Sequence, residues 1–258
     1  MMKKLSQNKT PGNQHGFTLI EMSIVLLVIG LILGAVSVGK DVQRNAEYMK
    51  VKQKFIDQWA AAYDTFYLRT GTVVGDNLLY PSMIVNSLNA PVIIGGNLTG
   101  NPAPAELCDA ALFAEMDRLG IRMPPGRAEG HEDRYVYLDS NGNPMEIQVC
   151  FRWNPPGTFS GSGNMMVIYG LTPDLARTLD QEIDGKPDSA EGMFRDAGLA
   201  TNGIGNGTPG QPNAEWLGNN TNNMGTLSTV ASAVPVVDAS RLDEDQVYVF
   251  TAHYKMTQ

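Results

Sequence analysis

The segment LDQEIDGKPDSAEGMFRD contains the carboxylates whose spacing could bind a metal ion. Asp180 and Asp184 are four residues apart, so in a helix they share one face, and Asp184 precedes a glycine that favours a turn. Carboxylate oxygens in such a turn can converge on Ca²⁺. The pattern is not an EF-hand. A solvated acidic turn without a cofactor is the default interpretation, and the alternative is a Ca²⁺ site formed by Asp180, Asp184 and Asp188.

The sequence offers little for enzyme chemistry. The three histidines, His15, His131 and His253, have no cysteine or carboxylate spacing typical of a zinc site. The run GSGN at 161–164 reads as a turn and not as a dinucleotide-binding fingerprint, and no phosphate-binding loop is present. We therefore expect a protein that is not an enzyme.

Charge is unevenly distributed along the 258 residues, whose formal net charge is −8. From Phe55 onward there are 11 basic and 24 acidic residues, whereas residues 39–54 are predominantly basic. An acidic body argues against nucleic acid as a partner, because nucleic acid is bound mainly through Lys and Arg. The basic stretch follows an apolar segment, where anionic lipid headgroups or acidic neighbouring subunits could meet it.

The apolar segment covers residues 17–38, and its only strongly polar residue is Glu21. A helix of this length spans about 33 Å, enough to cross a lipid bilayer. A cleaved secretory signal is disfavoured because the apolar run is too long and lacks a small-residue cleavage site. A plain anchor fits the length but leaves the carboxylate unexplained, since an acidic group within a spanning helix is unfavourable.

The stretch HGFTLIEMSIVLLVIGLILGAV resembles the amino-terminal signature of the type IV pilin and type II secretion pseudopilin superfamily. The resemblance implies a leader peptide at residues 1–16, cleavage between Gly16 and Phe17 by a prepilin peptidase, and N-methylation of Phe17. It makes Glu21, the fifth mature residue, the assembly residue. It also implies an inner-membrane assembly platform and other pilin or pseudopilin subunits as partners. The resemblance covers about 22 residues and does not extend to the rest of the chain.

A charge in lipid is tolerated when it finds a partner, and cleavage creates one in the new ammonium group of Phe17. We therefore expect Glu21 of one subunit to meet the Phe17 amine of a neighbour and to fix the axial offset of the two helices. The alternative is that the Glu21 side chain only reaches to the membrane surface.

Beyond the membrane, residues 39–70 predict an amphipathic continuation of the same helix. Apolar residues recur at a spacing near 3.6, with a gap at Gln53, and Gly71 is placed to end the helix. The aromatic residues of this stripe should pack on a globular domain. Gly30 and Gly34 form a G-x-x-x-G pair, which either permits close helix approach or weakens the helix locally.

Residues 71–258 predict a globular head of the α+β class, in which an antiparallel sheet packs on the long helix. RYVYLDSNGNPMEIQVCFRW reads as a hairpin around Asn141–Gly142, NMMVIYGL and EDQVYVFTAHYKM as strands, and residues 108–120 and 172–183 as short helices. In an exported domain, Cys108 and Cys150 should form a disulfide, with two buried thiols as the alternative. Residues 199–230 predict a surface loop that Trp216 and Leu217 could pin to the body.

These features predict a single-pass protein of the inner membrane with a periplasmic head, assembled later into an extracellular pilus or a periplasmic pseudopilus. The length of the head favours a minor or specialised subunit. A membrane-anchored adhesin or binding protein that uses residues 199–230 is the alternative.

Overall fold

The structure is a computed structural model that describes residues 17–87, 93–94, 97–98, 106–140, 142–200, 215–216 and 249–256. The chain divides into two compact units, Met1–Gln43 and Arg44–Gln258. Helix α1 (Leu19–Val51) begins in the first unit and ends in the second.

The helix continues beyond α1 through a π-helical turn, η1 (Lys52–Ile56), into α2 (Asp57–Thr70). Gly71 ends α2 as expected, with a φ of 70° and its N–H donating to the Tyr67 carbonyl at 2.8 Å. The expectation of one regular helix is wrong only at η1, which coincides with the break in the apolar spacing at Gln53. A π-turn accommodates one additional residue within a helix. Residues five apart are consequently neighbours, and Lys52 Nζ lies 3.0 Å from Asp57 Oδ2.

The buried stripes before and after η1 both belong to the core of the second unit. Tyr48 and Val51 are buried at the end of α1, as are Trp59, Tyr63 and Phe66 in α2. Phe55 and Ile56 of η1 are buried as well. The π-turn therefore lies within a continuous buried stretch of the helix.

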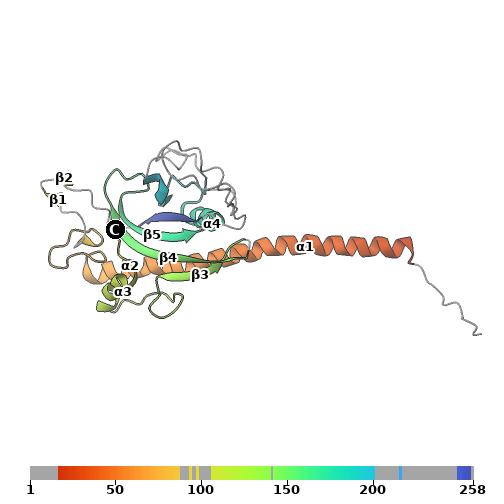
Figure 1. Ribbon diagram of the computed structural model, residues 1–258, viewed down its shortest axis with the longest axis horizontal. Coiled ribbons are helices and arrows are strands. Elements are labelled where there is room, and N and C mark those ends of the chain that lie inside the picture. The colour runs from red at the N-terminus through yellow and green to blue at the C-terminus, as the bar shows by residue number, and fades with distance from the viewer. Residues whose placement is uncertain are drawn as a thin grey trace, which may run out of the picture. The chain divides into compact units, whose positions relative to one another are not determined.

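A five-stranded antiparallel sheet in the order β3-β4-β5-β7-β6 forms the body of the second unit (Figure 1). β3 and β4 form the predicted hairpin, with Gly142 of the turn at a φ of 86°. A separate pair is formed by β1 and β2. The bounds are β1 (Ile93–Ile94), β2 (Asn97–Leu98), β3 (Arg134–Leu138), β4 (Pro144–Asn154), β5 (Gly163–Leu171), β6 (Phe194–Asp196) and β7 (Phe250–Lys255).

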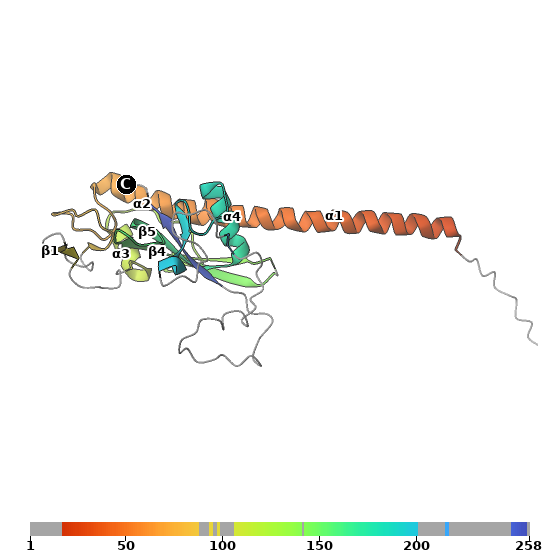
Figure 2. The same ribbon diagram turned by 90° about the horizontal axis from the view of Figure 1, so that it is seen from above.

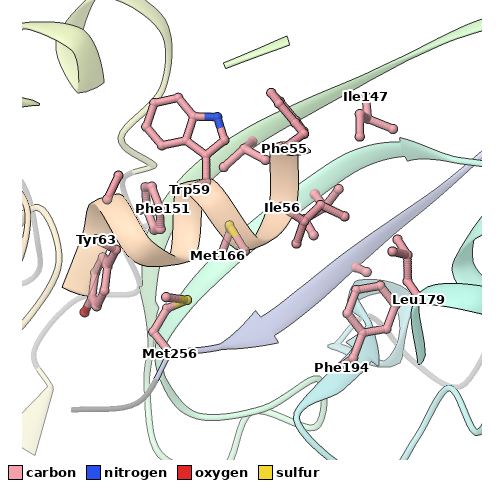
Figure 3. Close-up of a cluster of buried hydrophobic side chains, with 14 of the residues drawn as sticks. Phe55, Ile56, Trp59, Tyr63, Ile147, Phe151, Met166, Leu179, Phe194 and Met256 are labelled. Carbon is pink, nitrogen blue, oxygen red and sulfur yellow. The ribbon is translucent and has the colours of Figure 1, made fainter. Parts of the chain in front are cut away.

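One face of this sheet packs on the helix, which confirms the predicted α+β arrangement. Trp59 and Tyr63 of α2 lie close to Phe151 of β4 (Figure 3), with ring centroids 6.2 and 5.3 Å from that of Phe151. The Trp59 indole N–H donates to the Glu132 carbonyl at 3.2 Å, which satisfies its polar edge. The aromatic stripe of the helix thus serves packing.

Two short helices, α3 (Asp109–Arg118) and α4 (Pro173–Asp184), lie toward opposite ends of the sheet (Figures 1 and 2). Both occur where the sequence predicts helices. Thr172 is the N-cap of α4, ahead of Pro173, but its side chain makes no capping bond. Its hydroxyl lies 3.2 Å from the Tyr137 hydroxyl instead. A 3₁₀ turn, η3 (Ala197–Ala200), follows β6.

Candidate processing and assembly site

Thr18 and Glu21 form a reciprocal cap at the start of α1. The Thr18 backbone N–H and hydroxyl both donate to Glu21 Oε2, at 2.7 and 2.8 Å. The Glu21 N–H lies 3.3 Å from the Thr18 hydroxyl oxygen, which accepts from it. This arrangement is a capping box, which satisfies N–H groups that have no partner within the helix. The Glu21 carboxylate therefore has a local role within one chain.

The helix beyond this cap is apolar and exposed. Leu19–Val36 has a mean hydropathy of 2.7, and none of its residues is buried within the structure. By length and composition this helix could cross a membrane. A Cβ built at Gly30 or Gly34 would meet no atom within 4 Å among the described residues. Packing within the described chain thus does not explain the two glycines.

The predicted processing residues are described in part. Gly16 lies outside the described residues, whereas Phe17 precedes the helix with a side chain that is 79% exposed. Thr18 is the partner of Glu21 that our sequence reasoning missed. The signal was present, because Thr18 and Glu21 have the Thr-x-x-Glu spacing of a capping box.

Comparison with protein families gives a match at this end of the chain. Residues 11–37 match the prokaryotic N-terminal methylation motif. Together with the apolar helix, the motif supports a type IV pilin-like protein of the prepilin type. Such proteins are structural and usually not enzymes, and the motif and helix fit a membrane-anchored single-pass pilin. No curated protein and no solved structure matches the chain.

The pilin-like head contains the disulfide expected from the sequence. Cys108 and Cys150 are bonded, with their Cα atoms 4.7 Å apart. Cys108 is the N-cap of α3 and Cys150 lies in β4, so the bond ties this helix to the sheet. Leu107 and Phe151 add two backbone hydrogen bonds beside it, at 2.8 and 3.0 Å.

The acidic segment has internal partners for its carboxylates. Asp184 accepts from the N–H groups of Met193 and Phe194, at distances of 2.8–3.0 Å. Asp188 accepts from the Ala190 N–H at 2.9 Å. Asp180 is fully buried, and its Oδ2 accepts from the Trp216 indole at 2.8 Å. These carboxylates hold the turn after α4 in place, and the Ca²⁺ site stays a prediction.

The two histidines of the described residues differ in environment. His131 is exposed, whereas His253 is buried in β7, with its Nδ1 atom 2.9 Å from the Ser160 hydroxyl and 3.2 Å from Asn154 Nδ2. Burial, and then the charge of Arg152, lowers the pKa of His253 to about 4. Ser160 is only 1% exposed, so this pair offers no accessible nucleophile.

Proposed function

We propose that this chain is the precursor of a structural filament subunit, processed at its amino terminus and assembled through α1. A prepilin peptidase cleaves between Gly16 and Phe17, Phe17 is N-methylated, and the bilayer holds residues 17–38 until assembly. The observation that carries this proposal is the methylation motif at residues 11–37, placed on an exposed apolar helix whose first turn contains Glu21.

The carboxylate of Glu21 gains a second role after cleavage. Its capping bonds to Thr18 use Oε2 and leave Oε1 without a hydrogen-bond partner among the described residues. The ammonium of Phe17 in a neighbouring subunit could approach that oxygen, and a charge in lipid is tolerated when it is paired. In each subunit of the filament, residues 39–70 would extend the helix beyond the apolar segment. Residues 71–258 would form the head, exposed on the filament.

The first experiment asks where the mature chain begins. Mass spectrometry of the protein isolated from its native membrane should give an amino-terminal peptide that starts at Phe17 with an added methyl group. A working form that retains residues 1–16 would contradict the proposal.

The second experiment separates the charge of Glu21 from its capping role. Glu21→Gln preserves the capping box, because Gln is also found at this position of the box, but removes the charge. Glu21→Ala removes both, and Thr18→Ala removes the side-chain cap alone. If the charge pairs with the neighbouring amine, Glu21→Gln and Glu21→Ala insert and are cleaved but do not enter filaments, whereas Thr18→Ala does. Normal assembly of Glu21→Gln would refute the pairing.

Within this class we favour a minor or specialised subunit of a type IV pilus or a type II secretion pseudopilus. Its head would be periplasmic before assembly, and an inner-membrane assembly platform would insert it into the filament. Purification of filaments followed by counting of subunits tests this assignment, since a bulk building block would greatly outnumber the other subunits. An anchored adhesin that uses residues 199–230 remains the alternative, and most of that segment lies outside the described residues.

A further inference from the structure

A cavity of about 680 Å³ opens at the end of the sheet where β4 and β7 finish. Its apolar wall includes Trp153, Met83, Met193 and Met256, the last of which Figure 3 shows at the end of β7. This volume is typical of small-molecule sites, which are mostly apolar with a few polar groups that orient the ligand. Methionine side chains adapt readily to the shape of a ligand.

A smaller cavity of about 130 Å³ adjoins the first and supplies polar groups. The two cavities share Ser162, Met193 and Lys255, and the smaller one adds Arg195. Arg195 is held in place because its Nε donates to the Gly192 carbonyl at 2.8 Å. This bond restrains the Arg195 side chain beside the cavity.

Neither basic side chain of these cavities pairs with a carboxylate in the described part of the chain. Among the described residues, the Arg195 side chain donates to the carbonyl oxygens of Gly192 and Phe159, and the side chains of Lys255 and Ser162 form no hydrogen bond. From residue 55 onward, acidic residues outnumber basic ones by 24 to 11. Two cations without acidic partners in so acidic a domain are available for an external anion.

The cavity wall is fixed by an unusual loop conformation. Met83 has a φ of 60°, which is uncommon for a long side chain and often marks a functional site. The Met83 N–H donates to Asp76 Oδ2 at 2.8 Å, and the Met83 carbonyl accepts from Asn164 Nδ2 at 2.9 Å. Asp76 also accepts from Ser82 and Ser87. These bonds hold the strained residue against the cavity.

We propose that this double cavity, which we name the strand-end cavity, binds an oxyanion carried on an apolar or aromatic body. Lys255, Arg195 and the Ser162 hydroxyl receive the anionic group, and Trp153 with the three methionines receives the apolar body. A carboxylate and a phosphate have the chemistry required, so the test compares both. This inference goes beyond the proposed filament role and does not depend on it.

The test uses the full-length protein in lipid nanodiscs with ¹³C-methyl-labelled methionine, followed by NMR. Phenylacetate should shift the methyl signals of Met83, Met193 and Met256, while those of Met116 and Met145, which do not line the cavity, stay in place. Phenylacetamide has the same body without the charge and should bind about tenfold more weakly, as expected for loss of a charge-assisted hydrogen bond. Phenyl phosphate is the second anionic probe, and tighter binding than that of phenylacetate would assign a phosphate ligand.

The variant Arg195→Gln/Lys255→Gln should weaken the binding of either anion at least about tenfold. Arg122→Gln, which removes an exposed cation that lines neither cavity, should leave binding unchanged. Unshifted Met116 and Met145 signals show that the double variant is folded. Equal binding of phenylacetate and phenylacetamide by the unmodified protein, no binding of either anion at millimolar concentration, or shifts confined to Met116 and Met145 would overturn the proposal.

Discussion

The indole N–H of Trp216 donates to Oδ2 of Asp180 over 2.8 Å, in the buried interior of the head. This bond joins α4 to a residue 36 positions further along the chain. Trp216 also packs on Phe194 and Phe250, with ring centroids 5.6 and 5.5 Å apart. The predicted contact of Trp216 with the body is thus confirmed, with Asp180 as the hydrogen-bond acceptor of its indole. Leu217, which was predicted to take part in this contact, lies outside the described residues.

Asp180 should make the stability of the head fall as pH rises. Burial, and then the nearby Asp184 and Asp188, raises the pKa of Asp180 to about 8, although the Trp216 bond acts in the opposite direction. The folded protein therefore holds a proton that the unfolded chain releases near pH 4. The contribution is fully present below that pH and is lost progressively up to about pH 8, on the order of 1 kcal/mol per pH unit.

Denaturant unfolding of the full-length protein in detergent, at several pH values, measures this effect. Asp180→Asn keeps an acceptor for Trp216 but cannot titrate, so its free energy of unfolding should fall less between pH 5 and 8. Glu182→Gln, which changes an exposed carboxylate of the same helix, should behave as the unmodified protein does. Identical pH profiles for all three proteins would show that Asp180 is ionised at neutral pH.

His253 should produce the opposite pH dependence. Burial lowers the pKa of His253 to about 4 in the folded head. In the unfolded chain His253 binds a proton near pH 6.5, whereas in the folded head it stays neutral at that pH. Stability due to neutral His253 is present above pH 6.5 and is lost as pH falls toward 4. Between pH 6.5 and 4, the His253→Asn variant should lose less stability than the unmodified protein does, by on the order of 1 kcal/mol per pH unit. A packing defect in the variant would lower its stability equally at every pH and would not change this slope. An unchanged slope in the same unfolding measurement would contradict the lowered pKa.

The disulfide between Cys108 and Cys150 should contribute about 2–4 kcal/mol to the stability of the head, because it closes a loop of 42 residues in the unfolded chain. The double variant Cys108→Ser/Cys150→Ser should lower the free energy of unfolding by that amount. Addition of a reducing agent should have the same effect on the unmodified protein and none on the variant. Alkylation of two thiols in the native, unreduced protein would contradict the bond.

Local sequence signals predicted those parts of the fold that depend on short-range physics. The hairpin of β3 and β4 follows from alternation around a turn whose Gly142 adopts a φ of 86°, and α2 ends at Gly71 as its type and position suggest. In the candidate site, the motif around Glu21 was evident from residue types alone, although the capping partner Thr18 was overlooked.

Long-range partners could not be predicted in this way. The bond from Trp216 to Asp180 and the contact of Asn164 with Met83, 81 positions apart, depend on how the chain folds back on itself. The same applies to the strand-end cavity, whose walls come from separate segments. No local pattern contains that information.

The π-turn η1 leads to a prediction about deletions in the helix. From the sequence, this position was visible only as a gap in the apolar spacing at Gln53. If η1 accommodates one additional residue, deletion of the exposed Gln53 should convert it to regular α-helix and leave Tyr48 and Trp59 facing the sheet. Deletion of Ala61, an exposed residue within regular α2, has no π-turn to absorb it. It should rotate the following residues by about 100° and turn Tyr63 and Phe66 away from the core.

We therefore expect the Gln53 deletion to change the free energy of unfolding by less than about 1 kcal/mol, and the Ala61 deletion to cost at least about 3 kcal/mol, as loss of a buried aromatic residue does. Denaturant unfolding followed by tryptophan fluorescence compares the two. Because each variant lacks one exposed residue of the same helix, chain length and surface composition are matched. Equal destabilisation by both deletions would show that η1 is required for packing in its π-helical form.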